Sequence, residues 1–354
     1  MNADLFGDIF HTEPDLNATT SGGVYGQVGP DYEGELPAGI TKIPFPYNSS
    51  VIFIRADKYS PLGVDQIAAA RHFRANLQMQ SLADWQKDPT GGKAHVLSPF
   101  LFSQPVKRMA DEGIQFATEN FLATLQKAMA SPTTEPLTAA DKKLIAEFNK
   151  RFDAAKKTAK GTGLVLADIT EGARAAHAAL NDRWLSHRDK NNWIHFNNIG
   201  HWGKSYLDRA ALTEYIQFGN ELKTAYYAHA FVDGGNVTLD GSAYSYRIHF
   251  TKAQIPQAER FWSITAYTPE DVQLVENPLD KYVVAQYTPG LVYDALGGVT
   301  VYLQANIPKK APTANWLPVP NGPFNVMLRI YGPTIDPKHP YVPPKITRLP
   351  YGSL

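Results

Sequence analysis

The clearest hydrophobic pattern of this sequence lies in its last third, at residues 261–331. Short runs of Val, Ile, Leu, Tyr, Phe and Trp are separated there by clusters of Pro, Gly, Asn and Asp. Within residues 299–304 every second side chain is apolar, and the others are Thr, Tyr and Gln. Alternation with period two between turn residues is typical of half-buried antiparallel strands. The pattern predicts a C-terminal jelly roll or β-sandwich.

Shorter β-like stretches occur earlier in the chain. Residues 24–56 are predicted to contain strands, with an Asn-Ser-Ser turn at residues 48–50 before the apolar run 51–54. Residues 225–250 contain two Gly-rich turn signals, Asp-Gly-Gly at 233–235 and Asp-Gly at 240–241. Glycine supplies the positive φ of tight hairpin turns, so two neighbouring strands are expected on either side of them.

The middle of the chain changes to a helical period. Apolar residues recur at spacings of three and four within residues 65–85, 105–130, 138–160 and 168–187, and a short helix is expected from Ser205. The chain is therefore predicted to be α+β and mainly β, with three parts. These are a β-rich N-terminal domain with one helix at 1–104, a helical segment at 105–190 and the C-terminal jelly roll at 191–354.

Composition removes several classes of function. The 34 basic and 34 acidic residues cancel, so no global charge attracts nucleic acid or an anionic membrane. There is no cysteine, which excludes disulfides, thiolate nucleophiles and thiolate metal sites. Neither a signal peptide nor an apolar run of about 20 residues is visible. We expect a soluble protein without membrane insertion.

Four runs of the sequence resemble a known family. They are YLDRAALTEY, DGGNVTLDGSAYSYRIHF, FWSITAY and NWLPVPNGPFNVMLRIYGP. Together, over residues 205–331, they look like a group of bacterial proteins built from paired domains of unknown function. The segment GQVGPDYEGELPAGITKIPFPYNSSVIFIRAD is similar to the end of that family's N-terminal domain. The resemblance implies a two-part β-rich architecture with jelly-roll sheets and packed helices, and it implies little about chemistry.

The sequence departs from this family at its N-terminal end. The family usually has on the order of a hundred further residues before the GPDY-like segment, often after an export signal. Here residues 1–28 precede it. The N-terminal domain is therefore predicted to be a shortened one. An unpaired sheet edge is a template for association, so a homo-oligomer is expected.

Standard catalytic motifs are missing, because the chain has no GxSxG, HExxH, P-loop or GxGxxG pattern. Histidines on strands expected to be adjacent suggest a metal site instead. His229 and His249, with Asp233 at the turn between them, could bind one divalent metal ion. The alternative is that each histidine is simply hydrogen-bonded in place.

Two arginines are candidate anion ligands. Arg209 follows Tyr206 in the predicted short helix, and a buried arginine can clamp a carboxylate or a phosphate. The alternative is an internal ion pair with a neighbouring acid. Arg329 in the run MLRIYGP is either an anion contact on a sheet face or a paired structural residue.

Aromatic side chains could line a cleft for an apolar ligand, and Trp262 and Tyr267 are candidates. At strand spacing they could equally belong to the core. Asn315 and Trp316 lie in a Pro-flanked turn, where they either face a ligand or anchor the turn over the core.

Two hypotheses for function follow. The first is a hydrolase that acts on a small, partly apolar or anionic substrate in an aromatic-lined cleft. Arg209 would orient the anion, and His201 or His229 with Asp233 would act as base or metal ligand. The second is a non-catalytic module for ligand binding or assembly through its jelly-roll faces.

Overall fold

The structure is a computed structural model of the 354-residue chain. The residues that it describes are 2–4, 9–11, 23–45, 50–52, 56, 58–60, 62–90, 106–130, 137–158, 164–216, 219–269, 272–335 and 340–354. The chain folds into two compact units, each assembled from separate stretches. The first comprises residues 1–53, 102–184 and 202–218, and the second comprises 54–101, 185–201 and 219–354.

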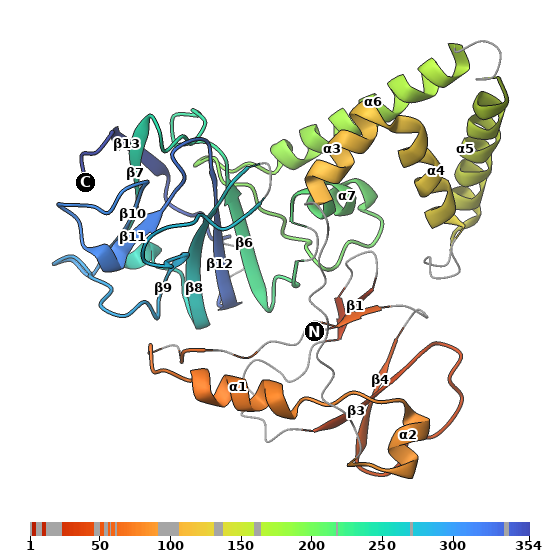
Figure 1. Cartoon of the computed structure of the whole chain (residues 1–354), viewed down its shortest axis with the longest axis horizontal. Helices are drawn as coiled ribbons and strands as arrows, with labels where there is room; N and C mark the ends of the chain where they lie inside the picture. Colours follow the sequence, from red (N-terminus) through yellow and green to blue (C-terminus); the bar gives the residue numbers. More distant parts are fainter. Residues whose placement is uncertain are drawn as a thin grey trace. The chain divides into compact units, whose positions relative to one another are not determined.

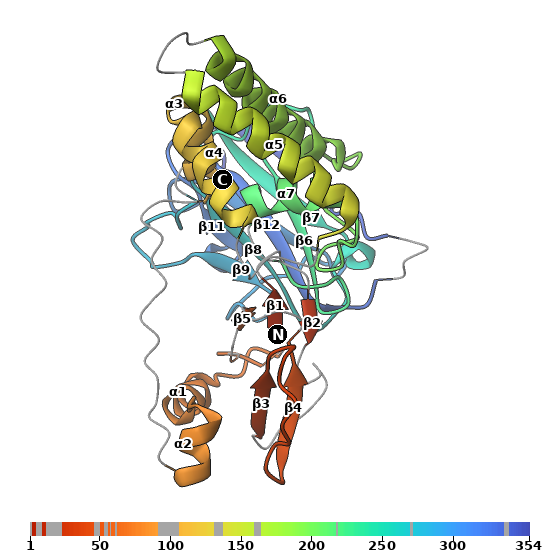
Figure 2. The same cartoon turned by 90° about the vertical axis from the view of Figure 1, so that its right-hand side faces the viewer.

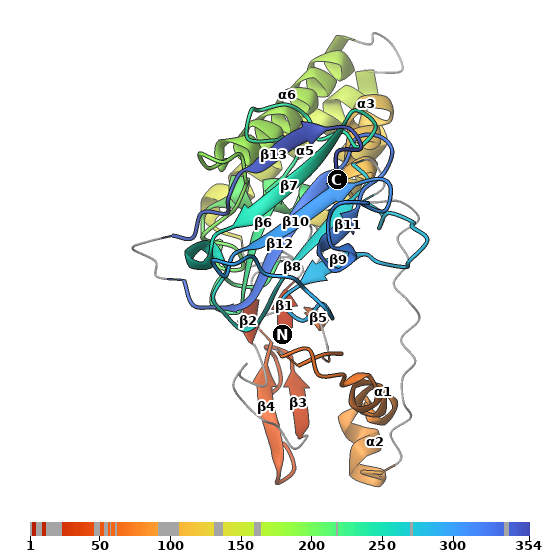
Figure 3. The same ribbon diagram turned by 90° about the vertical axis from the view of Figure 1, so that its left-hand side faces the viewer.

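The second unit is built around two four-stranded sheets that face each other (Figure 1). One has the order β6 (Ala225–Ala230), β12 (Asn325–Pro333), β8 (Ala258–Tyr267), β9 (Val283–Ala285). The other has the order β11 (Trp316–Pro318), β10 (Val299–Gln304), β7 (Tyr244–Phe250), β13 (Ile346–Pro350). Figure 3 shows the second sheet in front of the first.

A single hydrophobic core fills the space between the two sheets. Every second residue of the long strands points into it, for example Ile264 on β8, Leu328 on β12 and Val301 on β10, all with no exposed surface. This is the arrangement expected for sheets packed face to face, in which inward side chains interdigitate. The predicted alternation over residues 299–304 is confirmed, because Val299, Val301 and Leu303 are all core residues.

The predicted α+β chain with a C-terminal β-sandwich is confirmed, but the strand order does not support the jelly roll. A jelly roll consists of eight strands in two Greek keys. Here β10 and β11 are consecutive, adjacent and parallel. A parallel pair needs a crossover, which residues 305–315 provide and which includes the short 3₁₀ helix η2 (Thr313–Asn315).

The second unit also contains helices α1 (Ile67–Asn76), α2 (Leu82–Lys87) and η1 (Lys252–Gln254). The sequence pattern predicts one helix over residues 65–85, and the structure has two. Leu77 leaves the helical region with a ψ of 123°. Ser81 then caps α2 by accepting a hydrogen bond from the Asp84 backbone N–H at 3.2 Å, which starts a new helix.

The other α-helices belong to the first unit. They are α3 (Val106–Phe116), α4 (Thr118–Met129), α5 (Ala139–Thr158), α6 (Leu164–Ser186) and α7 (Tyr206–Tyr215). The predicted helix at 105–130 is therefore interrupted at Ala117, whose φ of −139° is not helical. No helix in the described part of the chain is long and apolar enough to cross a membrane.

Short strands complete the first unit. β3 (Val24–Val28) and β4 (Ile40–Pro44) are paired in parallel, as Figure 2 shows. β1 (Asn2–Asp4) pairs with both β2 (Ile9–His11) and β5 (Ser50–Ile52). The predicted turn at residues 48–50 lies mostly outside the described residues.

Side chains near the C-terminal end of α6 hold this helix against α7. The Tyr215 hydroxyl donates to Asn181 Oδ1 at 2.6 Å, and the Tyr215 ring stacks on Trp184 with centroids 4.4 Å apart. Arg183 forms an ion pair with Asp208, which is buried. These contacts fix the rotation of the two helices relative to each other.

Candidate functional site

The outer face of the β6–β12–β8–β9 sheet is polar although much of it is buried. Inward positions on these strands belong to the core, so the alternate positions point to the opposite side. We call this surface the polar face. Its members are Tyr227, His229, Phe261, Ser263, Thr265, Tyr267, Asn325, Met327, Arg329 and Tyr331. A buried sheet face is usually apolar, so this composition marks the surface as a candidate site.

Strand register places Arg329 in the middle of the polar face. It lies on β12 directly opposite Ser263 of β8 on one side and Tyr227 of β6 on the other. Residues opposite each other in a sheet have Cβ atoms about 5 Å apart. The base of the guanidinium side chain is therefore flanked by two side chains that carry hydroxyl groups.

The Arg329 guanidinium has an aromatic partner but no acidic one. It lies 5.6 Å from the centre of the Tyr267 ring, and it is partly buried. Within the described residues no carboxylate forms an ion pair with it. Arg348 of the same unit is different, because its Nε lies 3.2 Å from Asp233 Oδ2. Arg329 is thus a cation without a protein counter-charge in the described structure.

His229 and Asn325 form a buried polar pair next to Arg329. His229 Nε2 lies 2.7 Å from Asn325 Oδ1. Burial lowers the pKa of His229 from 6.5 to about 4, although the hydrogen bond with Asn325 acts to raise it, and the Arg329 charge lowers it further. The imidazole is therefore neutral at pH 7, so it does not add a second positive charge beside Arg329.

Aromatic rings border the polar face at the Tyr331 end. Phe261 lies 4.8 Å from Tyr331 and 4.9 Å from Tyr287, measured between ring centres. Tyr59 stacks on Tyr287 at 5.3 Å. All four rings are partly exposed. They place an apolar surface on the same side of the sheet as the Arg329 charge.

The structure does not bring together the predicted metal ligands His229, His249 and Asp233. The expectation that β6 and β7 are adjacent is wrong, because they belong to different sheets. His249 is exposed, with Nδ1 2.9 Å from Thr300 Oγ1. Asp233 accepts backbone hydrogen bonds in its turn and pairs with Arg348. The three side chains therefore have separate structural partners.

Three further predicted residues lie outside the polar face. Arg209 and Tyr206 are on α7 in the first unit, where the guanidinium carbon lies 5.4 Å from the centre of the Tyr206 ring. His201 is exposed, and its Nε2 lies 2.6 Å from Glu221 Oε2. Of the predicted catalytic residues, only His229 is on the polar face.

Trp262, Asn315 and Trp316 are structural residues of the sandwich. Trp262 and Trp316 have no exposed surface, and the Trp316 indole donates to the Gln304 carbonyl at 2.9 Å. Asn315 exchanges two hydrogen bonds of 2.8 Å with the backbone of Val292. Of the two interpretations of this turn, the contacts support an anchored turn over the core.

A second cluster, in the first unit, was missed by sequence reasoning. Nε2 of His177 on α6 lies 3.2 Å from Oδ1 of Asp111 on α3 and 2.8 Å from Oε1 of Glu214 on α7. It is the one set of three or more His, Asp or Glu side chains among the described residues that could hold a metal ion. No spacing in the sequence points to it, because its members come from three separate helices.

Comparison with known proteins identifies a domain but no activity. Residues 224–335, which contain the whole polar face, match the family model described as "Protein of unknown function (DUF1214)". This confirms the resemblance to a family of unknown function. No match was found among curated proteins.

Two solved structures are similar to the chain. The crystal structure of the VPA0106 protein from Vibrio parahaemolyticus has a TM-score of 0.52 and 20% identity, covering 93% of this chain and 76% of that one. An uncharacterised protein from Burkholderia cenocepacia has a TM-score of 0.31 and 19% identity, covering 49% of this chain and 39% of that one. The first likeness shows a shared fold.

Proposed function

We propose that the DUF1214 domain at residues 224–335 of this chain binds a small molecule that carries a carboxylate or phosphate group beside an apolar part. The observation that supports this most directly is Arg329. Its guanidinium is partly buried on a polar sheet face and has no carboxylate partner within the described residues.

The cost of burying a cation favours an anionic ligand at this place. Taking a charge out of water is unfavourable unless an opposite charge or hydrogen bonds replace the solvent. An oxyanion can accept two parallel hydrogen bonds from a guanidinium, which is the strongest such arrangement available to arginine. Ser263 and Tyr227, opposite Arg329 in the sheet, carry further hydroxyl groups, and the Tyr227 oxygen accepts a hydrogen bond from the Asn220 backbone N–H at 3.3 Å.

The surroundings favour a ligand that is not purely ionic. Phe261, Tyr287 and Tyr331 form a partly exposed aromatic border on the same side of the sheet. Aromatic rings stabilise bound apolar groups through buried area and stacking. Together with a single cation, this border suits an organic acid or a phosphate ester better than an inorganic anion.

A hydrolase is the enzymatic form of this proposal. His229 is neutral at pH 7 because burial lowers its pKa to about 4, so it would act only as a weak base, with Asn325 holding the ring. Ser263 is the hydroxyl opposite Arg329. Simple ligand binding needs only Arg329 and the aromatic border, so we place binding first and hydrolysis second.

The experiment measures binding of matched small anions by calorimetry and by thermal shift. The set pairs benzoate and phenyl phosphate with acetate, inorganic phosphate and neutral benzamide. We expect the two aromatic anions to bind and raise the melting temperature. Arg329→Lys, which keeps the charge and loses the fork geometry, should weaken binding by about 10- to 100-fold.

Arg247→Lys is the control, because Arg247 is an exposed arginine on β7 in the opposite sheet. It should leave the affinity unchanged. Equal binding of benzoate by the wild-type protein and the Arg329→Lys variant would refute the anion site. Turnover of phenyl acetate or phenyl phosphate that Arg329→Lys and His229→Gln both abolish would extend the site to hydrolysis.

A further inference from the structure

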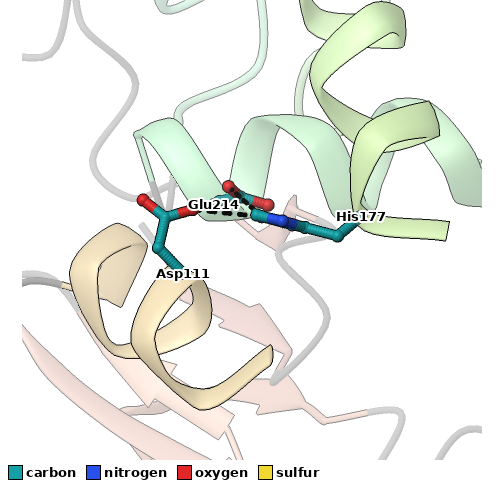
Figure 4. A group of neighbouring side chains, drawn as sticks. All are labelled: Asp111, His177 and Glu214. Carbon is teal, nitrogen blue, oxygen red and sulfur yellow. Dashed lines mark hydrogen bonds and ion pairs between the residues drawn. The ribbon is translucent and has the colours of Figure 1, made fainter. Parts of the chain in front are cut away.

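We propose that Asp111, His177 and Glu214 in the first unit form a binding site for one divalent transition metal ion of the zinc type. Figure 4 shows the three side chains converging from α3, α6 and α7. This site is separate in its residues from the polar face, and it does not depend on the function proposed above.

The positions of the three ligand atoms suit a metal ion. His177 Nε2 lies 3.2 Å from Asp111 Oδ1 and 2.8 Å from Glu214 Oε1. All three ligand atoms lie within 4.8 Å of one another. In a tetrahedral zinc site with bonds of about 2.1 Å, neighbouring ligand atoms are roughly 3.4 Å apart. The distances from His177 Nε2 to the two carboxylates would therefore increase by a few tenths of an ångström on metal binding.

The cluster is closed on one side and open on the other. The Glu214 side chain is 5% exposed and that of His177 is 15% exposed, whereas that of Asp111 is 39% exposed. A buried carboxylate and imidazole supply ligands with little freedom to move. The open Asp111 side gives a metal ion a path of entry and leaves coordination positions for water, as in sites with three protein ligands.

Contacts around the cluster orient His177 toward Glu214. Asn181 and Trp184, four and seven residues further along α6, both contact Tyr215 of α7. Residues at this spacing share one face of a helix, so His177 lies on the same face of α6 as the two residues that contact α7. Supporting contacts of this kind position metal ligands before the ion binds.

The chemical character of the ligands selects the class of metal. Imidazole binds zinc, iron, nickel and copper well, whereas carboxylates also bind magnesium and manganese. One neutral imidazole with two carboxylates carries two negative charges, which a divalent ion neutralises. The alternative occupant of the same position is a proton, which would give an imidazolium ion paired with both acids. Metal titration distinguishes the two.

The first measurement is calorimetric titration of chelator-treated, untagged protein with zinc chloride, together with the visible spectrum after addition of cobalt chloride. We expect one equivalent of zinc to bind. The protein with bound cobalt should show visible absorption bands typical of a cobalt ion in a low-symmetry site. This readout does not require enzymatic activity. Magnesium chloride should bind more weakly by at least about tenfold.

Three substitutions test the ligands, namely Asp111→Asn, His177→Gln and Glu214→Gln. Each should raise the dissociation constant for zinc by more than about tenfold, since loss of an outer partner alone often costs that much. The control is His201→Gln, because His201 also contacts a carboxylate, Glu221 at 2.6 Å, but has no third ligand nearby among the described residues. It should leave zinc affinity unchanged.

Two results would overturn the metal site. One is wild-type protein that takes up no zinc and gives no cobalt bands. The other is a loss of affinity in His201→Gln as large as that in His177→Gln. Asp111 is partly exposed, so Asp111→Asn remains informative if a substitution at the more buried positions prevents folding.

Discussion

At the scale of single residues, Arg329 and His229 owe their character to their neighbours. Arg329 is surrounded by hydroxyl and aromatic side chains, and His229 is buried beside both it and Asn325. Both residue types were recognisable in the sequence as candidate ligands. Their neighbours were not, because Ser263 and Tyr227 lie far from Arg329 along the chain and meet it only through the sheet.

The buried His229 makes the stability of the protein depend on pH. Its folded-state pKa of about 4 is below the unfolded value of 6.5, so the unfolded state binds the proton more tightly. Well above pH 6.5 the ring is neutral in both states, and this group does not change the free energy of unfolding. That free energy falls as the pH decreases from 6.5 toward 4. We expect a loss of about 2 kcal/mol at pH 5 relative to pH 7 from this group.

Urea unfolding at pH 7 and pH 5 checks this expectation. His229→Gln should lose about 2 kcal/mol less than the wild-type protein over that interval, because the titrating group is gone. His249→Gln, at an exposed position on β7, should behave like the wild type. An identical pH dependence in the wild type and His229→Gln would contradict the assignment.

At the scale of elements, β12 organises the second unit. It pairs with β6 on one side and with β8 on the other, and its alternate residues divide between the core and the polar face. One strand thus supplies Leu328 to the core and Arg329 to the candidate site. Its regular alternation is what allows a single element to serve both purposes.

The core side of β12 can be tested independently of the polar face. Leu328→Ala should lower the free energy of unfolding by about 2–5 kcal/mol, because Leu328 has no exposed surface and its truncation leaves a cavity. Leu296→Ala is the matched control, since Leu296 is 86% exposed and its loss should change stability by less than about 0.5 kcal/mol. Chemical denaturation of both variants gives the comparison. A loss below about 1 kcal/mol in Leu328→Ala would contradict the described packing.

At the scale of the whole molecule, the chain forms two compact units from interleaved stretches of sequence. The proposed anion site and the proposed metal site belong to different units. Loss of zinc binding in His177→Gln should therefore leave benzoate affinity within about twofold of the wild-type value, as expected for independent sites. Calorimetry on the same variant measures both. A large change in both affinities would show that the sites are coupled.

Self-association of the whole molecule stays a prediction. Sheet edges that are not paired present free backbone groups to a second chain. We expect a homo-oligomer whose mass in light scattering depends on concentration. A monomeric mass at every concentration measured would contradict both the homo-oligomer and the assembly hypothesis.

Most elements, and the buried face of the regular ones, are predictable from the sequence, because helical and strand periods are local properties. The run at residues 299–304 is an example: its alternation predicted both the strand and its inward side chains. Most helices were also identified, apart from the interruptions at Ala117 and at residues 77–81, where two helices meet. The family resemblance had a local basis too, since its motifs are continuous runs.

Which side chains meet depends on how the elements pack. The placement of β6 and β7 in different sheets separated His229 from His249. The pairing of β8 with β12 brought Ser263 to Arg329. The convergence of Asp111, His177 and Glu214 likewise depends on how three helices pack. Such contacts join residues that are distant in sequence. They form because the packed elements bury a shared core against the entropy cost of closing the intervening loops. A local sequence pattern contains neither of these two quantities.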